Sequence, residues 1–181
     1  MLLSLLEFSS LFSYVPKKSI LVDQMTEEQK EALIFMDALK NDKQSVSLPS
    51  ISTTESIARY IKQTNPPLGD IFGQDVTLVP LPSHALRKEK YLWVPYNLAR
   101  ALEAHKLGTL NSCVERIKPV LQSSAVKPKD RPKAREHYQS VSINRINPPQ
   151  KKVVLVDDFI TRGATALGVA SKLQEVFPTI S

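Results

Sequence analysis

Apolar and polar positions repeat along the chain with two different periods, and together these periods predict an α/β fold. Continuous apolar runs of strand length begin at Val76 and at Val153, and polar residues follow each of them. Apolar residues three or four positions apart predict helices, and such runs span 26–40, 52–64, 92–106 and 166–177. The run at Val153 has the composition of a buried parallel strand, and a polar turn and a helix follow it, the order found at the ligand-binding edge of an open α/β sheet.

Two weaker strands and several helix ends complete the predicted order. The segment 114–120 is a strand candidate that Pro119 interrupts, and 137–143 alternates polar and apolar residues as a short edge strand does. A capping box begins the first helix at Thr26, and the Pro-rich segment 65–70 ends the second helix.

The N-terminal residues 1–15 are apolar but do not have the pattern of a targeting sequence. They contain Glu7, lack a basic start, and are too short and interrupted to span a membrane. We expect a helix whose apolar face docks on the domain. The predicted organisation is an N-terminal helical extension and linker over 1–70 and a core over 71–181.

The segment 153–165 carries the strongest chemical signal in the chain. Its apolar strand ends in Asp157 and Asp158, and a short turn then leads into the next helix. That turn consists of Thr161, Arg162, Gly163, Ala164 and Thr165. A loop before a helix presents unpaired N–H donors and the positive end of the helix dipole, which suits a phosphate. Gly163 also lets the backbone approach an anion closely.

The two carboxylates would repel a phosphate unless another group lies between them. They can accept hydrogen bonds from sugar hydroxyls, or they can hold Mg²⁺ through water. A ligand with a phosphate and a ribose diol, together with Mg²⁺, fits both parts of the segment. The alternative interpretation is a buried strand that ends in a solvated Asp157-Asp158 turn.

Over these 13 residues the chain resembles the phosphoribosyl-pyrophosphate (PRPP) binding motif of type I phosphoribosyltransferases. The resemblance implies a three-layer α/β fold of the phosphoribosyltransferase type, with a mostly parallel sheet and flanking helices. It also implies that Asp157 and Asp158 contact the ribose hydroxyls, and that 161–165 bind the 5′-phosphate. Arg162 departs from the motif, because many members carry a small hydroxyl residue there.

A second segment resembles the competence protein F (ComF) subgroup of these enzymes. Residues 79–84 read Val-Pro-Leu-Pro-Ser-His, and Arg87 follows before a helix. The resemblance places Ser83, His84 and Arg87 on the pyrophosphate side of the site. A cation and hydroxyl donors suit pyrophosphate oxygens there. The alternative for His84 is a turn residue that forms only local hydrogen bonds.

Positive charge is concentrated in one region. Residues 115–152 hold ten Lys or Arg against three acidic residues, an excess of seven, whereas the formal charge of the whole chain is +6. Pro residues break the segment 123–133, which predicts a loop. The resemblance implies a lid that closes over PRPP, with Lys129, Arg131, Lys133 and Arg135 as candidates. A solvated basic loop and a nucleic-acid contact are the alternatives.

The implied reaction displaces pyrophosphate from C1 of PRPP by a nitrogen acceptor whose identity the sequence does not give. The enzyme class is a glycosyltransferase, and the implied cofactor is Mg²⁺, carried by PRPP and by Asp157 and Asp158 without a direct protein ligand cluster. The alternatives are a non-catalytic PRPP- or nucleotide-binding regulator and a DNA-uptake or DNA-processing accessory protein. Among the basic residues of 115–152, only Tyr138 offers an aromatic ring for stacking, which disfavours nucleic acid.

The remaining features set limits on the interpretation. The single cysteine, Cys113, forms no intramolecular disulfide and fits a reducing, cytoplasmic compartment. Only 178–181 follow the last helix, so the final strand that the resemblance implies is short or missing. We expect no membrane partner, and the sequence leaves the oligomeric state open, with a homo-oligomer included.

Overall fold

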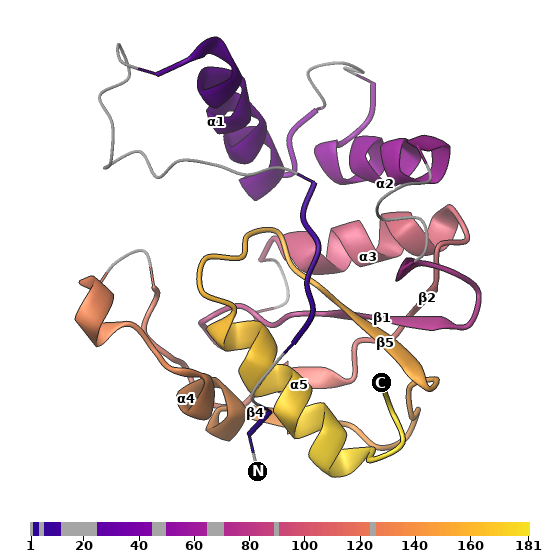
Figure 1. Cartoon of the computed structure of the whole chain (residues 1–181), viewed down its shortest axis with the longest axis vertical. Coiled ribbons are helices and arrows are strands. Elements are labelled where there is room, and N and C mark those ends of the chain that lie inside the picture. The colour runs from indigo at the N-terminus through magenta and orange to yellow at the C-terminus, as the bar shows by residue number, and fades with distance from the viewer. Residues whose placement is uncertain are drawn as a thin grey trace.

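The computed structural model describes residues 2–3, 6–11, 25–44, 50–64, 71–88, 91–123 and 126–181. Its elements, in chain order, are α1 (Glu27–Lys40), α2 (Thr53–Thr64), β1 (Val76–Pro80), α3 (Val94–Ala104), β2 (Thr109–Leu110), β3 (Val114–Arg116), the short 3-10 helix η3 (Pro128–Asp130), α4 (Ala134–Gln139), β4 (Val141–Ile143), β5 (Lys152–Val156) and α5 (Ala164–Val176). The fold is mixed α/β, as the alternation of strand and helix patterns predicts (Figure 1).

A parallel sheet forms the centre of the described structure. Its strand order is β2-β1-β5, and β1 pairs with β5 from Val76 opposite Lys152 to Pro80 opposite Val156. Because the strands are parallel, the carboxyl ends of β1 and β5 meet at the same edge, where ligands bind in open α/β sheets. A separate antiparallel pair joins β3 to β4.

Helices cover both faces of the parallel sheet. Val76 and Leu78 of β1 are buried in one core cluster with residues of α2 and α3, including Leu98. Val79 lies in a second cluster with Val169 and other residues of α5. This alternation follows from the strand period of two, which directs successive side chains to opposite faces. The central strand β1 is buried along its whole length, whereas the first four residues of β5 are only partly buried.

The predicted start of α1 is confirmed, and α3 begins at Val94, two residues after its predicted start at residue 92. Thr26 Oγ1 accepts a hydrogen bond from the Gln29 N–H at 3.3 Å, and the Gln29 side chain returns one to Thr26 N at 3.1 Å. Pro95 lies in the first turn of α3, where its missing N–H costs nothing. The expected end of α2 at 65–70 lies outside the described residues. Strand β2 was not predicted, because two residues are too few for a periodic signal.

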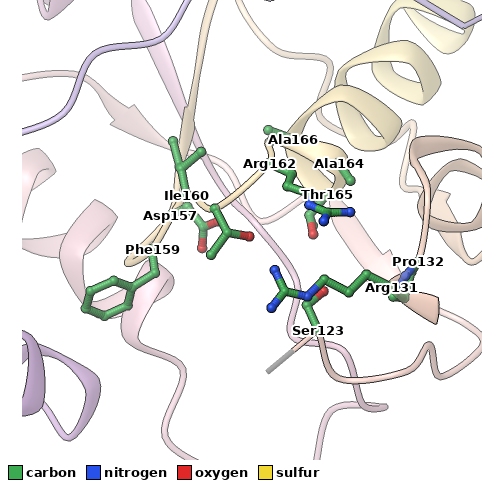
Figure 2. Close-up of a pocket in the computed structure, with 12 residues that line it drawn as sticks. Ser123, Arg131, Pro132, Asp157, Phe159, Ile160, Arg162, Ala164, Thr165 and Ala166 are labelled. Atoms are coloured by element: carbon green, nitrogen blue, oxygen red, sulfur yellow. The ribbon is translucent and has the colours of Figure 1, made fainter. Parts of the chain in front are cut away.

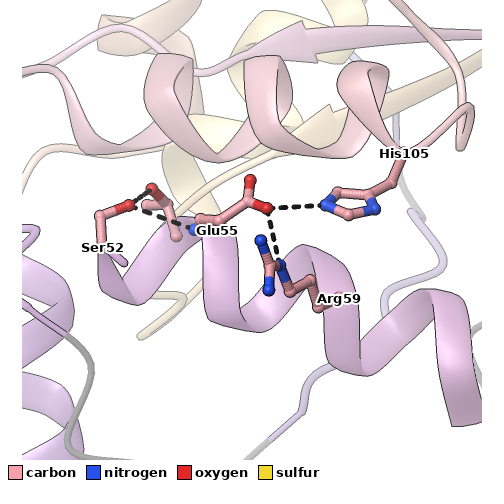
Figure 3. A network of polar contacts seen from close by, with 5 residues as sticks. Ser52, Glu55, Arg59 and His105 are labelled. Carbon is pink, nitrogen blue, oxygen red and sulfur yellow. Dashed lines mark hydrogen bonds and ion pairs between the residues drawn. The ribbon is translucent and has the colours of Figure 1, made fainter. Parts of the chain in front are cut away.

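A polar network ties α2 to the end of α3 (Figure 3). Glu55 Oε1 lies 2.9 Å from His105 Nε2 and accepts a hydrogen bond from Arg59 Nε at 2.9 Å. Ser52 Oγ accepts the Glu55 N–H at 3.3 Å and so covers the start of α2. Burial alone would raise the pKa of Glu55, but the hydrogen bonds from His105 and Arg59 outweigh it and lower that pKa. Leu39 of α1 and Ile57 of α2 also lie in the same buried cluster as β1, so the N-terminal helices share a core with the sheet. The boundary at residue 70 stays a prediction.

The expected helix over residues 1–15 is wrong for the part that the structure describes. Residues 6–11 are not helical, and their indigo trace in Figure 1 runs past α5 toward α1. Docking on the domain does occur: Leu6 and Leu11 pack against the two core clusters. The Leu3 N–H also donates to Ser171 Oγ of α5 at 2.9 Å. A non-helical segment reaches both clusters, whereas one helix of this length would cover less of the sheet.

The edge strand expected at 137–143 is also corrected. The chain is helical through Gln139 as α4 and becomes a strand only at Val141. The helix forms because α4 packs closely on α5 at Gly168, where an added Cβ would lie 2.5 Å from Ala134 O. The alternation of polar and apolar residues over 137–143 does not reveal this contact, because Gly168 is distant in sequence.

The C-terminal residues pair with β5 over a minimal length. Ser181 N donates to Lys151 O at 2.7 Å, and Val153 N donates to Ser181 O at 2.9 Å, the pattern of a parallel pair. In the described part of the chain no strand element follows α5. Across the same residues, no helix combines the length and apolar character that a membrane crossing requires.

Candidate functional site

The site lies where β5 ends and α5 begins. Asp157 follows β5 directly, and α5 starts at Ala164 after Gly163, which adopts a left-handed conformation with φ of 65°. A side chain at Gly163 would be strained by this backbone angle, although the space around it is open. The turn directs the first amides of α5 to one side, where they have no partner within the helix. This arrangement favours an anion.

These residues line one small pocket. Its lining residues are Ser123, Arg131, Pro132, Asp157, Phe159, Ile160, Thr161, Arg162, Gly163, Ala164, Thr165 and Ala166. Figure 2 shows Arg131 reaching into the pocket from the side opposite the start of α5. The loop before α4 and the β5–α5 turn therefore close around the same space. All five residues of the predicted phosphate loop, 161–165, contribute to it.

Arg131 carries an unsatisfied donor at this pocket. Its Nε is buried and has no hydrogen-bond partner among the described residues. A buried donor without a partner lowers stability, since it has left water without a replacement. The Arg131 side chain lines the pocket, and guanidinium groups bind phosphate oxygens well. Because Nε itself is covered, it could reach an acceptor only if the side chain moved when a ligand binds. The positive charge of Arg131 at the pocket is thus a physical reason to expect an anionic ligand.

The two carboxylates are held by the backbone immediately after β5. Asp157 Oδ1 accepts the Asp158 N–H at 3.0 Å, and Asp158 Oδ1 accepts the Phe159 N–H at 3.1 Å. Burial, followed by the negative charge of Asp158, raises the pKa of Asp157 well above its usual value. Such crowding is costly without a ligand, because the charged form of Asp157 is poorly solvated. Hydroxyl donors or a cation would relieve it.

Ser83, His84 and Arg87 do not line this pocket. Ser83 and His84 lie in the exposed loop after β1, and Ser83 Oγ is 3.4 Å from His84 Nδ1. The Arg87 guanidinium instead lies over the ring of Trp93, 4.8 Å from its centroid, and 5.9 Å from that of Tyr96. The loop belongs to the same edge of the sheet as Asp157, and its contact with pyrophosphate stays a prediction.

The four lid candidates separate into two kinds. Arg131 is partly buried and lines the pocket, whereas Lys129, Lys133 and Arg135 are exposed. Lys133 precedes α4 and donates its backbone N–H to Glu136 at 3.0 Å, which fixes the start of that helix. Of the four candidates, Arg131 is therefore the one that the structure places at the pocket. The spacing of the basic residues along the sequence did not favour any of them. Closure of the loop over a ligand stays a prediction.

A buried polar network behind the pocket was not recognised from the sequence. Arg116 is only 4% exposed, and its Nε donates to Ser83 O at 2.9 Å while Nη1 donates to Ser140 Oγ. Its Nη2 lies 3.5 Å from His137 Nδ1, and His137 Nε2 lies 3.5 Å from Thr165 Oγ1. One signal was available: Arg116 stands two residues after Val114, which places both on the buried face of β3.

The neutral state of His137 gives a testable pH dependence. Burial, followed by the charge of Arg116, lowers the pKa of His137 to about 4 from 6.5, while Glu136 opposes this shift. Stability from the neutral ring is present above pH 6.5 and is lost as the pH falls toward 4. We expect the free energy of unfolding to fall by about 3 kcal/mol over that range. Urea unfolding at a series of pH values measures it.

The matched control for this prediction is His137→Gln, which has no titrating ring. The free energy of unfolding of this variant should fall less between pH 6.5 and pH 4 than that of the wild type, because the contribution of His137 is absent. The other titrating groups should contribute equally in both proteins. An identical pH profile for both proteins would show that His137 is not held neutral in the fold.

The site defines an α/β protein with a candidate anion-binding loop beside paired carboxylates. Within the described ranges no group of three or more His, Cys, Asp or Glu side chains is arranged to hold a metal ion. Comparison with known protein families, with curated proteins and with solved structures finds no significant match to this chain. The functional argument therefore depends on the geometry of the pocket.

Proposed function

We propose that this protein binds PRPP and transfers its phosphoribosyl group to a nitrogen acceptor with release of pyrophosphate. One observation carries the proposal: a pocket lined by Asp157, the turn 161–165 and the positively charged Arg131. The pocket combines an anion-binding part with a carboxylate part. A ligand that has both a phosphate and a ribose diol would satisfy both.

The 5′-phosphate is assigned to the turn before α5. Backbone N–H groups of the first turn of the helix, the left-handed Gly163 and the hydroxyls of Thr161 and Thr165 supply donors without a bulky side chain. Arg131 adds a cation from the opposite side of the pocket. Together these groups would fix the phosphate and, through it, the orientation of the ribose.

The ribose hydroxyls are assigned to Asp157 and Asp158. Carboxylates accept hydrogen bonds from both hydroxyls of a diol, and two donors would compensate the crowding that raises the pKa of Asp157. As pyrophosphate leaves, positive charge builds on the ribose near C1, and nearby negative charge stabilises it. The carboxylates would thus act on the transition state as well as on the bound substrate.

The residues present fit Mg²⁺ only as a ligand-borne ion. Asp157 and Asp158 offer carboxylate oxygens, the donor type that Mg²⁺ prefers, but they form no complete protein cage. When bound, Mg²⁺ would neutralise charge on the pyrophosphate leaving group. The protein's own part is to hold the phosphate and the ribose in register and to cover them with the loop that carries Arg131.

A second candidate function is contact with single-stranded nucleic acid, and a cation–aromatic cluster after β1 favours it. Tyr91 is 72% exposed, and Lys88 Nζ lies 5.5 Å from its ring centroid. Trp93 and Tyr96 stack at 5.2 Å beneath Arg87. Exposed rings beside cations can stack on bases. We rank this second because Trp93 also donates to Leu81 O at 2.8 Å, a structural role.

Calorimetric titration with PRPP and Mg²⁺ tests the first proposal. We expect micromolar binding by the wild type and no detectable binding by the double variant Asp157→Asn/Asp158→Asn. Asp75→Asn is the matched control, since Asp75 is exposed at the opposite end of β1 and should leave binding unchanged. A folded wild type that does not bind PRPP would refute the proposal.

Activity separates the enzyme from a regulator. If PRPP binds, pyrophosphate release should be screened with nucleobases and amines as acceptors. Release that depends on an acceptor supports a transferase, whereas binding without release for every acceptor favours a PRPP-responsive regulator. Salt-dependent binding of an oligonucleotide in the absence of PRPP would favour the nucleic-acid candidate instead.

A further inference from the structure

Arg116 is a buried cation without a carboxylate partner. It is 4% exposed, and among the described residues its polar contacts go to neutral acceptors: Ser83 O, Ser140 Oγ and the His137 ring. A buried charge is unfavourable unless hydrogen bonds satisfy it. Three separate contacts do so here, so the position and direction of the guanidinium are well defined. Such a fixed donor can impose an orientation on its neighbours.

The first neighbour that it orients is His137. A guanidinium group only donates hydrogen bonds, so His137 Nδ1, 3.5 Å from Arg116 Nη2, has to accept. The ring is therefore neutral and carries its proton on Nε2. The low polarity of this buried position and the charge of Arg116 both favour the neutral ring.

The second neighbour is Thr165 in the phosphate turn. Its Oγ1 lies 3.5 Å from His137 Nε2, which has a proton to donate. A hydroxyl oxygen that accepts on one side keeps its own hydrogen for another acceptor. Thr165 also lines the pocket, so the acceptor available to it is an oxygen atom of a bound ligand.

We propose that Arg116 and His137 are positioning residues, which together hold the Thr165 hydroxyl as a donor toward a phosphate oxygen of the ligand. This inference rests on the proposed function, because it assigns the phosphate to the turn 161–165. It adds two residues that touch no ligand. The same Arg116 side chain binds Ser83 O in the loop after β1, so it also ties that loop to the phosphate turn.

A double-mutant cycle on PRPP affinity tests the arrangement. Thr165→Val removes the hydroxyl with little change of shape, and we expect it to weaken binding about tenfold, whereas Thr165→Ser should bind nearly as the wild type does. His137→Asn keeps an acceptor for Arg116 but has no donor that reaches Thr165, so it should weaken binding about fivefold. His137→Gln places an amide N–H near the position of Nε2 and should restore most of the affinity.

Whether the effects of the Thr165 and His137 substitutions on PRPP affinity are additive decides whether His137 acts through Thr165. In the Thr165→Val background, His137→Asn should cause no further loss, because the residue through which His137 acts is already absent. Equal losses in both backgrounds would overturn the proposal and show a general structural effect. Each variant is first shown to be folded by its circular dichroism and unfolding midpoint.

Ring resonances of His137 in the ligand-free protein separate this inference from the proposed function. We expect nitrogen chemical shifts of a neutral ring protonated at Nε2 between pH 7 and pH 5. A ring protonated at Nδ1 would overturn the positioning role even if PRPP binds. Failure of the wild type to bind PRPP, with the Nε2 form observed, would refute the proposed ligand and the donor role toward it, while the orientation of His137 would stand.

Discussion

Replacing Asp157 with Asn is expected to raise the thermal unfolding midpoint of the ligand-free protein while weakening PRPP binding about tenfold. The gain in stability follows from the raised pKa of Asp157, which reflects burial and the neighbouring charge of Asp158. An Asn has nearly the same shape and can still accept the Asp158 N–H, yet it carries no charge. The loss in binding follows because hydrogen bonds to a charged acceptor are about twice as strong as neutral ones.

The pH dependence gives this prediction a sign that can be checked. A carboxyl group whose pKa is raised on folding stabilises the fold at low pH, and that stabilisation is lost as the pH rises through the folded-state pKa. The advantage of Asp157→Asn should therefore vanish near pH 3.8 and below, and it should grow toward neutral pH. Thermal unfolding followed by circular dichroism at several pH values measures it.

Asp75→Asn again serves as the control, because it makes the same chemical change at an exposed position. It should alter neither the midpoint nor the affinity for PRPP. A variant of Asp157 that is less stable than the wild type at pH 7 would mean that the carboxylate is structural. Unchanged PRPP binding would remove Asp157 from the ribose site.

Gly168→Ala is expected to destabilise the protein by about 1–3 kcal/mol, although the same change in an exposed helix stabilises by up to about 1 kcal/mol. A Cβ at this position would lie 2.5 Å from Ala134 O, 2.7 Å from His137 Cβ and 2.8 Å from Tyr138 N. Two of these atoms belong to the backbone of α4, so the helix would have to move. Urea unfolding of both proteins measures the difference.

The displacement of α4 should also reduce the affinity for PRPP, because His137 lies on that helix and Arg131 lies just before it. Gly73→Ala is the matched control: its Cβ would meet only the side-chain carboxyl group of Asp75, which can rotate away. We expect that variant to remain within about 0.5 kcal/mol of the wild type. A Gly168→Ala protein that is more stable than the wild type would contradict the close packing of α4 on α5.

Local patterns were enough to predict the parts of the fold whose signals lie within one element. The apolar run before Asp157 and the turn and helix after it were evident from residues in direct succession; the helix expected over 166–177 is observed as Ala164–Val176, so it begins two residues earlier, inside the predicted turn. The capping box at Thr26 predicted the start of α1 for the same reason, since cap and partner are three residues apart. The coarse α/β class then follows from the order of these elements.

Contacts between distant segments decided the rest. Residues 137–143 alternate as a strand does, yet α4 forms there because Gly168, far along the chain, allows the two helices to touch. Arg87 carries a guanidinium group that could bind a phosphate, but in the structure this group lies over the ring of Trp93. The spacing of residues along the chain does not predict which of these contacts the side chain makes.

The sequence by itself was enough to predict a candidate segment for an anion and a sugar diol, because strand, carboxylates and turn are contiguous from Val153 to Thr165. Only the tertiary structure selected Arg131 from a run of similar basic residues and brought Arg116 and His137 behind Thr165. The physical reason is that hydrogen bonds and burial depend on distances in space. Periodicity along the chain reports which face a side chain takes, and it does not report which distant residue meets that face.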